Sequence, residues 1–153
     1  MKVLALDLAT TTGFAVLANG IVTHGAKDFA GKHDKTRHPG LRYLRFQRWL
    51  RDRIGEDKPE VIAVESAGHF KSLPAQSICV GFRGILLSTS AYYGIPLFEV
   101  GPSKLKKWAT GRGNARKEDM LAAARKSYPA ERFASPDACD AFLLLQYWRQ
   151  VAQ

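Results

Sequence analysis

Residues 135–145 have the sequence Ser-Pro-Asp-Ala-Cys-Asp-Ala-Phe-Leu-Leu-Leu and open the last apolar segment of the chain. The Ser-Pro pair is a helix start, and the apolar run after it predicts a buried helix over about Ser135–Gln150. Asp137 and Asp140 are three residues apart, so both carboxylates project from one face of the first helical turn. Complementing the helix dipole is one sufficient reason for acids there. However, like charges this close repel each other unless a cation or a proton offsets them, so acids elsewhere in the chain decide between structure and function.

The composition indicates one small, basic domain. The chain has 153 residues, of which 46% are hydrophobic, and this is enough for one sizeable core but not for two ordinary domains. We therefore expect residues 1–153 to form a single domain. The formal net charge of +9 favours a polyanionic partner, with nucleic acid first and an anionic membrane surface second.

Cysteine usage and the N-terminus indicate the compartment. Cys79 and Cys139 have no Cys-x-x-Cys spacing, so we interpret them as small buried residues of a reducing compartment and not as a disulfide or a zinc site. The N-terminal segment reaches a charge at Asp7 too early for a signal peptide, and no apolar run is long enough to span a bilayer. We expect a cytoplasmic protein with no membrane partner.

The first thirty residues predict three antiparallel strands. A Val- and Leu-rich strand over Lys2–Leu8 carries Asp7 near its end, and a polar turn over Thr10–Gly13 follows. The next strands are Phe14–Leu17 and Ile21–Phe29, joined by a hairpin turn of the Asn-Gly type.

The rest of the chain alternates helices and apolar strands. Two further strands are expected over Val61–Glu65 and Leu97–Val100. Helices are expected over Leu41–Ile54, Ala75–Tyr93, Lys104–Ala109, Lys117–Ser127 and the closing segment. The fold class is therefore α/β, a five-stranded mixed sheet flanked by helices. The helix over Ala75–Tyr93 is apolar around most of its circumference, which places it in the centre of the core or in an interface with a second subunit.

Four acids can meet in this fold. Asp7 and Glu65 lie at or near the ends of apolar strands, where an α/β fold places its site, and the closing helix can bring Asp137 and Asp140 across them. An apolar setting tolerates such a cluster only if divalent metal ions compensate the charge. Carboxylate oxygens select Mg²⁺ or Mn²⁺, and two such ions can activate a water and stabilise the leaving oxygen of a phosphodiester. The residues therefore indicate a metal-dependent nuclease.

Basic residues cluster in two places. The denser cluster surrounds a glycine-rich loop over Thr110–Lys117, in which exposed backbone N–H groups can meet an anion. Its members are Lys104, Lys106, Lys107, Arg112, Arg116 and Lys117. The second lies on the helix over Leu41–Ile54, behind a basic loop over Gly31–Gly40, and there we favour phosphate contacts by Arg42 and Arg45 over a merely solvated face.

The loop after Glu65 carries His69, Phe70 and Lys71. Phe70 is a candidate wedge at the centre of a DNA junction, although packing on the neighbouring helix explains it equally well. Lys71 is a candidate DNA contact. The remaining histidines, His24 among them, are interpreted as surface residues.

These motifs together resemble the RuvC Holliday-junction resolvases, which belong to the RNase H-like, or retroviral-integrase, superfamily. The resemblance covers nearly the whole chain in order. It rests on the Asp7 strand with its Thr-Gly, on Val64-Glu65, on the run Lys106 to Lys117, and on Pro136-Asp137-Ala138-Cys139-Asp140-Ala141. It implies a homodimeric endonuclease that makes paired, symmetric nicks in four-way DNA junctions with two Mg²⁺ or Mn²⁺ ions per active site. Compact, divergent chains of this type occur in bacteriophages as well as in bacteria.

The resemblance also implies residue roles. Asp7, Glu65, Asp137 and Asp140 match the four catalytic, metal-binding acids. Lys106 and Lys117 match the basic residues near the scissile phosphate, and the helix Ala75–Tyr93 matches the dimer helix.

The chain departs from the family pattern in three places. The usual Asp-Pro-Gly after the first acid is Asp7-Leu8-Ala9, and the segment after Glu65 is shifted from the usual Gln and aromatic. The loop over Gly31–Gly40 and the arginine-bearing helix after it are unusually basic. These departures affect the preferred cleavage sequence rather than the set of acids.

Four alternatives stay open at this point. The chain could act as a broader branched-DNA nuclease, as an RNA-processing nuclease of the RuvX type, or as a non-catalytic binder of branched DNA. The RuvX branch lacks the Lys106–Lys117 segment. An actin-like ATPase is also suggested by the Asp-Leu-Ala-Thr-Thr-Thr-Gly stretch, but it needs two such domains, for which this chain is too short.

Overall fold

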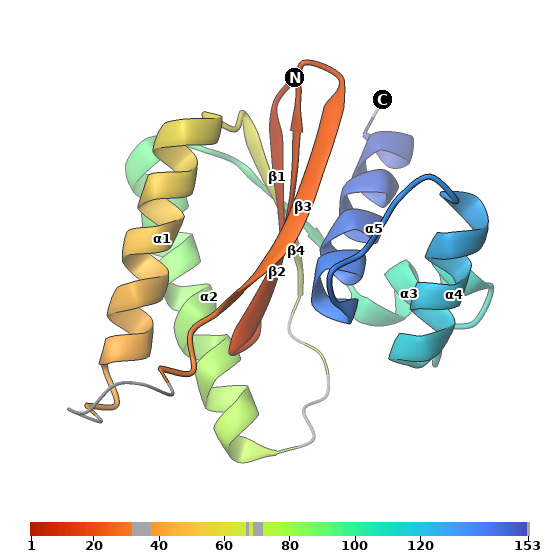
Figure 1. The fold of residues 1–153 in the computed structure, drawn as a ribbon. Helices are drawn as coiled ribbons and strands as arrows, with labels where there is room; N and C mark the ends of the chain where they lie inside the picture. The colour runs from red at the N-terminus through yellow and green to blue at the C-terminus, as the bar shows by residue number, and fades with distance from the viewer. Residues whose placement is uncertain (32–37, 67, 69–71, 153) are drawn as a thin grey trace.

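The computed structural model describes residues 1–31, 38–66, 68 and 72–152, which form a mixed sheet with helices on both faces (Figure 1). The five strands have the order β3-β2-β1-β4-β5. They are β1 (Val3–Asp7), β2 (Thr11–Ala18), β3 (Ile21–Asp28), β4 (Val61–Glu65) and β5 (Leu97–Val100). The helices are α1 (Leu41–Asp57), α2 (Leu73–Tyr93), α3 (Pro102–Thr110), α4 (Lys117–Ser127) and α5 (Pro136–Val151).

The strand directions confirm the predicted fold class. β1, β2 and β3 pair in antiparallel fashion, whereas β1 and β4, and then β4 and β5, run parallel. Parallel strands end at the same edge of a sheet, so β1 and β4 bring Asp7 and Glu65 to one edge. This edge therefore carries two of the four acids.

The predicted turn before the second strand is wrong in its extent. β2 begins at Thr11 instead of Phe14. The Thr12 side chain is fully buried, and its hydroxyl donates a hydrogen bond to the Ala9 carbonyl at 2.7 Å, so a short turn suffices. The predicted hairpin is confirmed, since Asn19 and Gly20 both have the positive φ that this turn requires.

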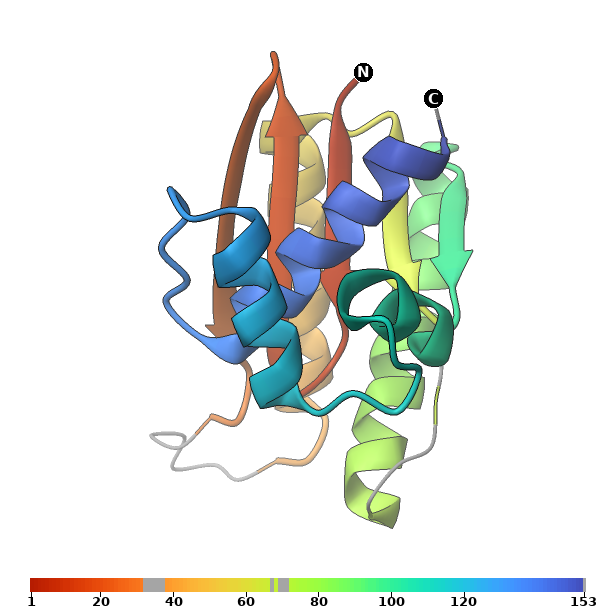
Figure 2. The same cartoon turned by 90° about the vertical axis from the view of Figure 1, so that its right-hand side faces the viewer.

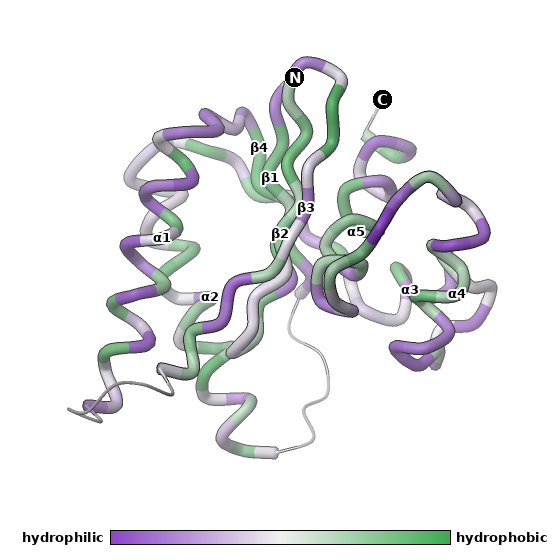
Figure 3. The backbone as a smooth tube through the Cα atoms, in the orientation of Figure 1, coloured by the Kyte–Doolittle hydropathy of each residue, from purple (hydrophilic) through white to green (hydrophobic). Residues whose placement is uncertain are grey.

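Side-chain alternation along the strands separates two apolar cores. On one face, Leu4, Leu6, Val16, Ile62 and Val64 pack under α1 and α2. On the other face, Val3, Ala5, Ala15, Leu17 and Ala63 pack under α5, α3 and α4. The two helical layers lie on opposite sides of the sheet, and apolar segments line its faces (Figures 2 and 3). Asp7 lies two residues after Ala5, and Glu65 lies two residues after Ala63. Because side chains alternate between the two faces of a sheet, both acids belong to the α5 face.

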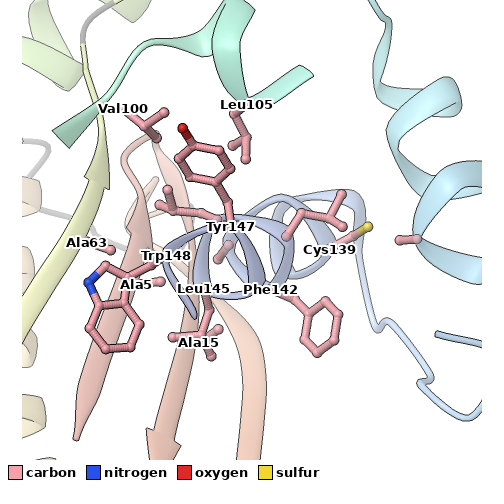
Figure 4. Close-up of a cluster of buried hydrophobic side chains, with 14 of the residues drawn as sticks. Ala5, Ala15, Ala63, Val100, Leu105, Cys139, Phe142, Leu145, Tyr147 and Trp148 are labelled. Atoms are coloured by element: carbon pink, nitrogen blue, oxygen red, sulfur yellow. The ribbon is translucent and has the colours of Figure 1, made fainter. Parts of the chain in front are cut away.

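A row of three alanines crosses the sheet beneath α5. Ala5 pairs with Ala15 on one side and with Ala63 on the other, and all three are fully buried. Large side chains of α5, among them Phe142 and Trp148, lie around this row (Figure 4). Because methyl groups occupy little space, the axis of α5 can approach the sheet closely at this point.

Candidate active site

The strand ends hold the first two acids. Asp7 is the last residue of β1 and Glu65 is the last residue of β4, and both side chains are half-buried. Four apolar residues precede the acid in β1 and three precede it in β4, and all seven are completely buried, which fixes the backbone that carries each acid. Asp7 also pairs in register with Gly13 of β2.

The first turn of α5 holds the other two acids. Ser135 caps this helix, because its hydroxyl accepts a hydrogen bond from the Ala138 backbone N–H at 3.2 Å, and Pro136 occupies the first turn. The side chains of Asp137 and Asp140 are only 20% and 15% exposed to solvent. Both acids therefore lie against the protein and not in open solvent.

Three of the four acids share one cleft of about 810 Å³ with two lysines. The cleft is lined by Asp7, Ala9, Glu65, Lys106, Ala115, Arg116, Lys117, Glu118, Met120 and Asp140. These residues come from β1, β4, α3, α4 and α5, from the connection between β1 and β2, and from the connection before α4. Segments far apart in the chain thus meet at the predicted site.

The carboxylates in the cleft hold protons unusually tightly. The pKa of Asp7 is raised to about 6, mainly by burial and also by the charge of Asp137, against the attraction of Lys117. The pKa of Glu65 is raised to about 7, mainly by burial and also by repulsion from Asp7 and Asp140. Burial and repulsion from Asp7 raise the pKa of Asp140 to about 7. Burial is the main cause in all three cases, so the cleft disfavours the ionised carboxylates more than its lysines favour them.

Lys117 makes the direct contacts to the acids of α5. Its Nζ donates a hydrogen bond to Asp137 Oδ1 at 2.9 Å and lies 4.0 Å from Asp140 Oδ2. Burial opposes the charge on Lys117, but the hydrogen bond and the nearby acids outweigh it, so its pKa is raised. Lys106 also faces the cleft and lowers the pKa of both Glu65 and Asp140. Both predicted lysines thus act electrostatically on the acids.

The donor set fits a hard divalent cation. Carboxylate oxygens are the ligands that Mg²⁺ and Mn²⁺ prefer, and a divalent charge would relieve the repulsion that raises these pKa values. Within the described part of the chain, no three His, Cys, Asp or Glu side chains already stand as a metal-binding group. Asp7, Glu65 and Asp140 share one cleft, but they do not yet form a ligand group. To hold an ion there, their side chains would have to turn toward one another.

The predicted DNA contacts lie in three places. Lys104 and Lys107 are exposed on α3, and Arg116 lines the cleft. Arg112 is exposed and pairs with Asp119 at 3.2 Å. Phe70 and Lys71, like His69, lie outside the described residues.

Arg42 and Arg45 line a separate pocket of about 180 Å³ together with His38 at the start of α1. This pocket is not part of the acid cleft. The starts of α1 and α5 nevertheless lie toward the same end of the sheet, the end at which β1 and β4 finish (Figures 1 and 2).

α2 exposes apolar side chains along its length. Leu73, Val80 and Leu87 keep 78%, 53% and 43% of their exposure, and Tyr92 is also exposed. No α-helix in the part of the chain that the structure describes has both the length and the apolar character needed to cross a bilayer.

Three features escaped the sequence analysis. Glu118 lines the cleft, and its place in the first turn of a basic helix gave no signal for this. Gly13 lies against the backbone of Asp137 on the α5 face of the sheet. The Thr-Gly pair in the sequence could have drawn attention to this glycine. The surface assignment of His24 is wrong: its side chain is 10% exposed, contacts two phenylalanine rings and lies 3.1 Å from Glu131.

The relatives found by comparison with known sequences belong to one family. No model of a known protein family matches the chain. A crossover junction endodeoxyribonuclease RuvC of Synechococcus sp. (strain WH7803) is 29% identical over 98% of this chain and 99% of its own. The RuvC of Synechococcus sp. (strain CC9311) is 33% identical over 76% of this chain and 74% of its own.

The fold agrees as well. The structure of Thermus thermophilus RuvC in complex with a Holliday junction substrate superposes with a TM-score of 0.73 at 18% identity, over 99% of this chain and 96% of that one. This likeness assigns the RNase H-like fold. The relatives in sequence show that the chain belongs to the RuvC family of crossover junction endodeoxyribonucleases.

Proposed function

We propose that this protein is a metal-dependent endonuclease that resolves four-way DNA junctions by paired, symmetric nicks. One observation carries the proposal: a single cleft brings together Asp7, Glu65 and Asp140, whose pKa values are raised by burial and mutual repulsion, with Lys106 and Lys117 beside them. Acids in that state need a cation, and lysines at the rim suit an anionic substrate. Membership of the RuvC family makes the phosphodiester of junction DNA that substrate.

Two Mg²⁺ or Mn²⁺ ions would be held by Asp7, Glu65 and Asp140, with Asp137 as a further ligand or as an orienting group. When bound, such ions supply an activated water and stabilise the leaving oxygen of the phosphodiester. The protein's part is to hold the carboxylates close together in one cleft. Their raised pKa values make this site bind protons in competition with metal, so we expect metal affinity to increase between about pH 6 and pH 8.

The lysines and arginines would hold the DNA backbone. Lys106 faces the acids and Lys117 lies directly over Asp137, so either ammonium can offset charge that develops on the phosphate. Lys104, Lys107, Arg112 and Arg116 would extend this contact along α3 and the start of α4. The pocket of Arg42 and Arg45 lies toward the same end of the sheet, where it would hold a more distant phosphate.

A second copy of the chain would pack on α2, over about Ala75–Tyr93. Residues at alternating intervals of four and three along this helix are all exposed, and they form one stripe: Leu73, Ser77, Val80, Gly84, Leu87 and Ala91. This spacing is that of a helix seam in a coiled coil. A Cβ added at Gly84 would meet nothing within 4 Å, so the middle of the stripe is open to a close helix crossing. Two subunits would provide the two active sites that paired nicks require.

We further propose that residues 1–153 act as one nuclease domain. Both apolar cores include residues of β1, β2, β4 and β5, so neither can form without the sheet that the other needs.

The deciding experiment compares labelled DNA substrates. The protein is incubated with a four-way junction, a three-way junction, a flap, a linear duplex and a structured RNA, each with Mg²⁺, Mn²⁺ or EDTA. Symmetric paired nicks in the four-way junction, absent with EDTA, are the expected result. Equal cutting of all branched DNA would make it a general debranching nuclease, and cutting of RNA alone would make it an RNA-processing nuclease. Junction binding without cutting under any condition would leave a non-catalytic binder.

A further inference from the structure

Gly13 lies between the two halves of the acid site. In the sheet it is the register partner of Asp7, directly across from it on β2. On the α5 face it meets the main chain of the helix: a Cβ built on Gly13 would overlap the Asp137 carbonyl oxygen and lie 2.6 Å from the Asp137 carbonyl carbon. The backbone nitrogen of Ala138 would be 3.4 Å away.

These neighbours are backbone atoms, which cannot rotate away as the end of a long side chain can. The first turn of α5 is also fixed by Pro136 and by the hydrogen bond from the Ala138 N–H to the Ser135 hydroxyl. A methyl group at position 13 would therefore displace the whole turn, and with it both Asp137 and Asp140.

We propose that Gly13 is a positioning residue, whose missing side chain sets how closely the acids of α5 approach Asp7. The inference rests on the proposed metal-dependent function, because its consequence is the affinity of the acids for a divalent ion. It goes beyond the acids and lysines by assigning their spacing to a residue that carries no functional group. Displacing the turn by a few tenths of an ångström is enough to spoil a shared ion, since metal–oxygen distances tolerate about ±0.2 Å.

The chain offers a matched control in Gly25 on β3. A Cβ there would lie 2.8 Å from the end of the Phe14 ring, which is a side chain and not backbone. Gly25→Ala therefore adds the same methyl group to the same sheet and strains a side-chain contact, without touching α5.

The test measures Mn²⁺ binding by electron paramagnetic resonance on the folded, uncut protein, with circular dichroism and a denaturant titration on each variant. We expect Gly13→Ala to weaken Mn²⁺ binding at least ten-fold, toward the value of Asp140→Asn, and to lower junction cleavage while junction binding persists. Gly25→Ala should keep wild-type Mn²⁺ affinity, even if its unfolding midpoint falls by as much as that of Gly13→Ala. A folded Gly13→Ala variant with wild-type Mn²⁺ affinity would overturn the proposal.

Two further arms keep the result decisive. If Gly13→Ala does not fold, Ser135→Ala loosens the same turn without adding an atom, and unchanged Mn²⁺ affinity in that variant would also overturn the proposal. If the wild-type protein binds no Mn²⁺ and matches Asp140→Asn, the metal-dependent function itself has failed, and this outcome is distinct from a failure of Gly13 alone.

Discussion

The Nζ of Lys117 donates a hydrogen bond to Oδ1 of Asp137 across 2.9 Å. The lysine is the first residue of α4 and the acid belongs to the first turn of α5, so the contact joins the starts of two helices. The Lys117 side chain keeps 61% of its exposure, which leaves its ammonium within reach of a ligand that enters the cleft.

Replacing this lysine should separate catalysis from stability. We expect Lys117→Met to lower the cleavage rate by roughly 10²-fold, because a charge that faces the reacting phosphate is lost. Stability should change by less than about 1 kcal/mol, since the lysine of this ion pair is largely exposed. Single-turnover cleavage and urea unfolding measure the two effects. Lys126→Met, on the exposed last turn of the same helix, is the control, and an equal loss of rate there would refute the specific role.

Neutralising an acid of the cleft should stop the chemistry but not the binding. For Asp7→Asn and Asp140→Asn we expect cleavage to fall by about 10³-fold or more, because each removes a carboxylate proposed to hold metal. Junction affinity, measured by gel shift in EDTA, should stay the same or rise because negative charge is removed. Asp52→Asn, at an exposed position of α1, should behave as wild type. Full cleavage by either cleft variant would show that the replaced acid is not needed for catalysis.

The acid cluster should cost stability at neutral pH. The pKa of Asp140 is 3.8 in its ordinary state and about 7 in the fold, so the folded protein binds this proton more tightly than the unfolded chain does. Its contribution to the free energy of unfolding is therefore fully present below about pH 4 and is lost as the pH rises to about 7.

Asp140→Asn removes this pH dependence. We expect the variant to gain on the order of 1–3 kcal/mol over wild type at pH 8, and progressively less toward pH 4. Urea unfolding in EDTA across this range measures the difference. A gain that is the same at every pH would show that Asp140 does not carry the shifted proton.

The stripe on α2 should control the oligomeric state. Val80→Lys places a charge in the middle of the proposed seam, where a second subunit would have to bury it, so we expect a monomer by light scattering. Its circular dichroism spectrum should match wild type, since Val80 is exposed in the single chain. Val151→Lys alters an exposed apolar residue at the end of α5 and should leave the dimer intact. A wild-type protein that is monomeric at all concentrations would contradict the dimer itself.

Local sequence patterns were sufficient for the order of the strands and helices, and they place the four predicted acids at strand ends and at a helix start. Strand ends and a helix start are recognisable within a few residues, so Asp7, Glu65 and Asp137 could be identified before any tertiary contact was known. The contact of Gly13 with Asp137 could not be, because it depends on how deeply a helix more than a hundred residues later settles on the sheet. The burial of His24 was missed for the same reason: its covering rings come from Phe133 and Phe142.

The alanine row across β2, β1 and β4 links core packing to the active site. α5 is a continuous helix from Pro136 to Val151, so it moves largely as a rigid rod. A bulkier residue at Ala5, Ala15 or Ala63 would lift this rod from the sheet, and its carboxylate-bearing end would tilt with it. Substitutions in the apolar interior should therefore appear as changes in metal requirement, even though none of the three methyl groups belongs to the cleft.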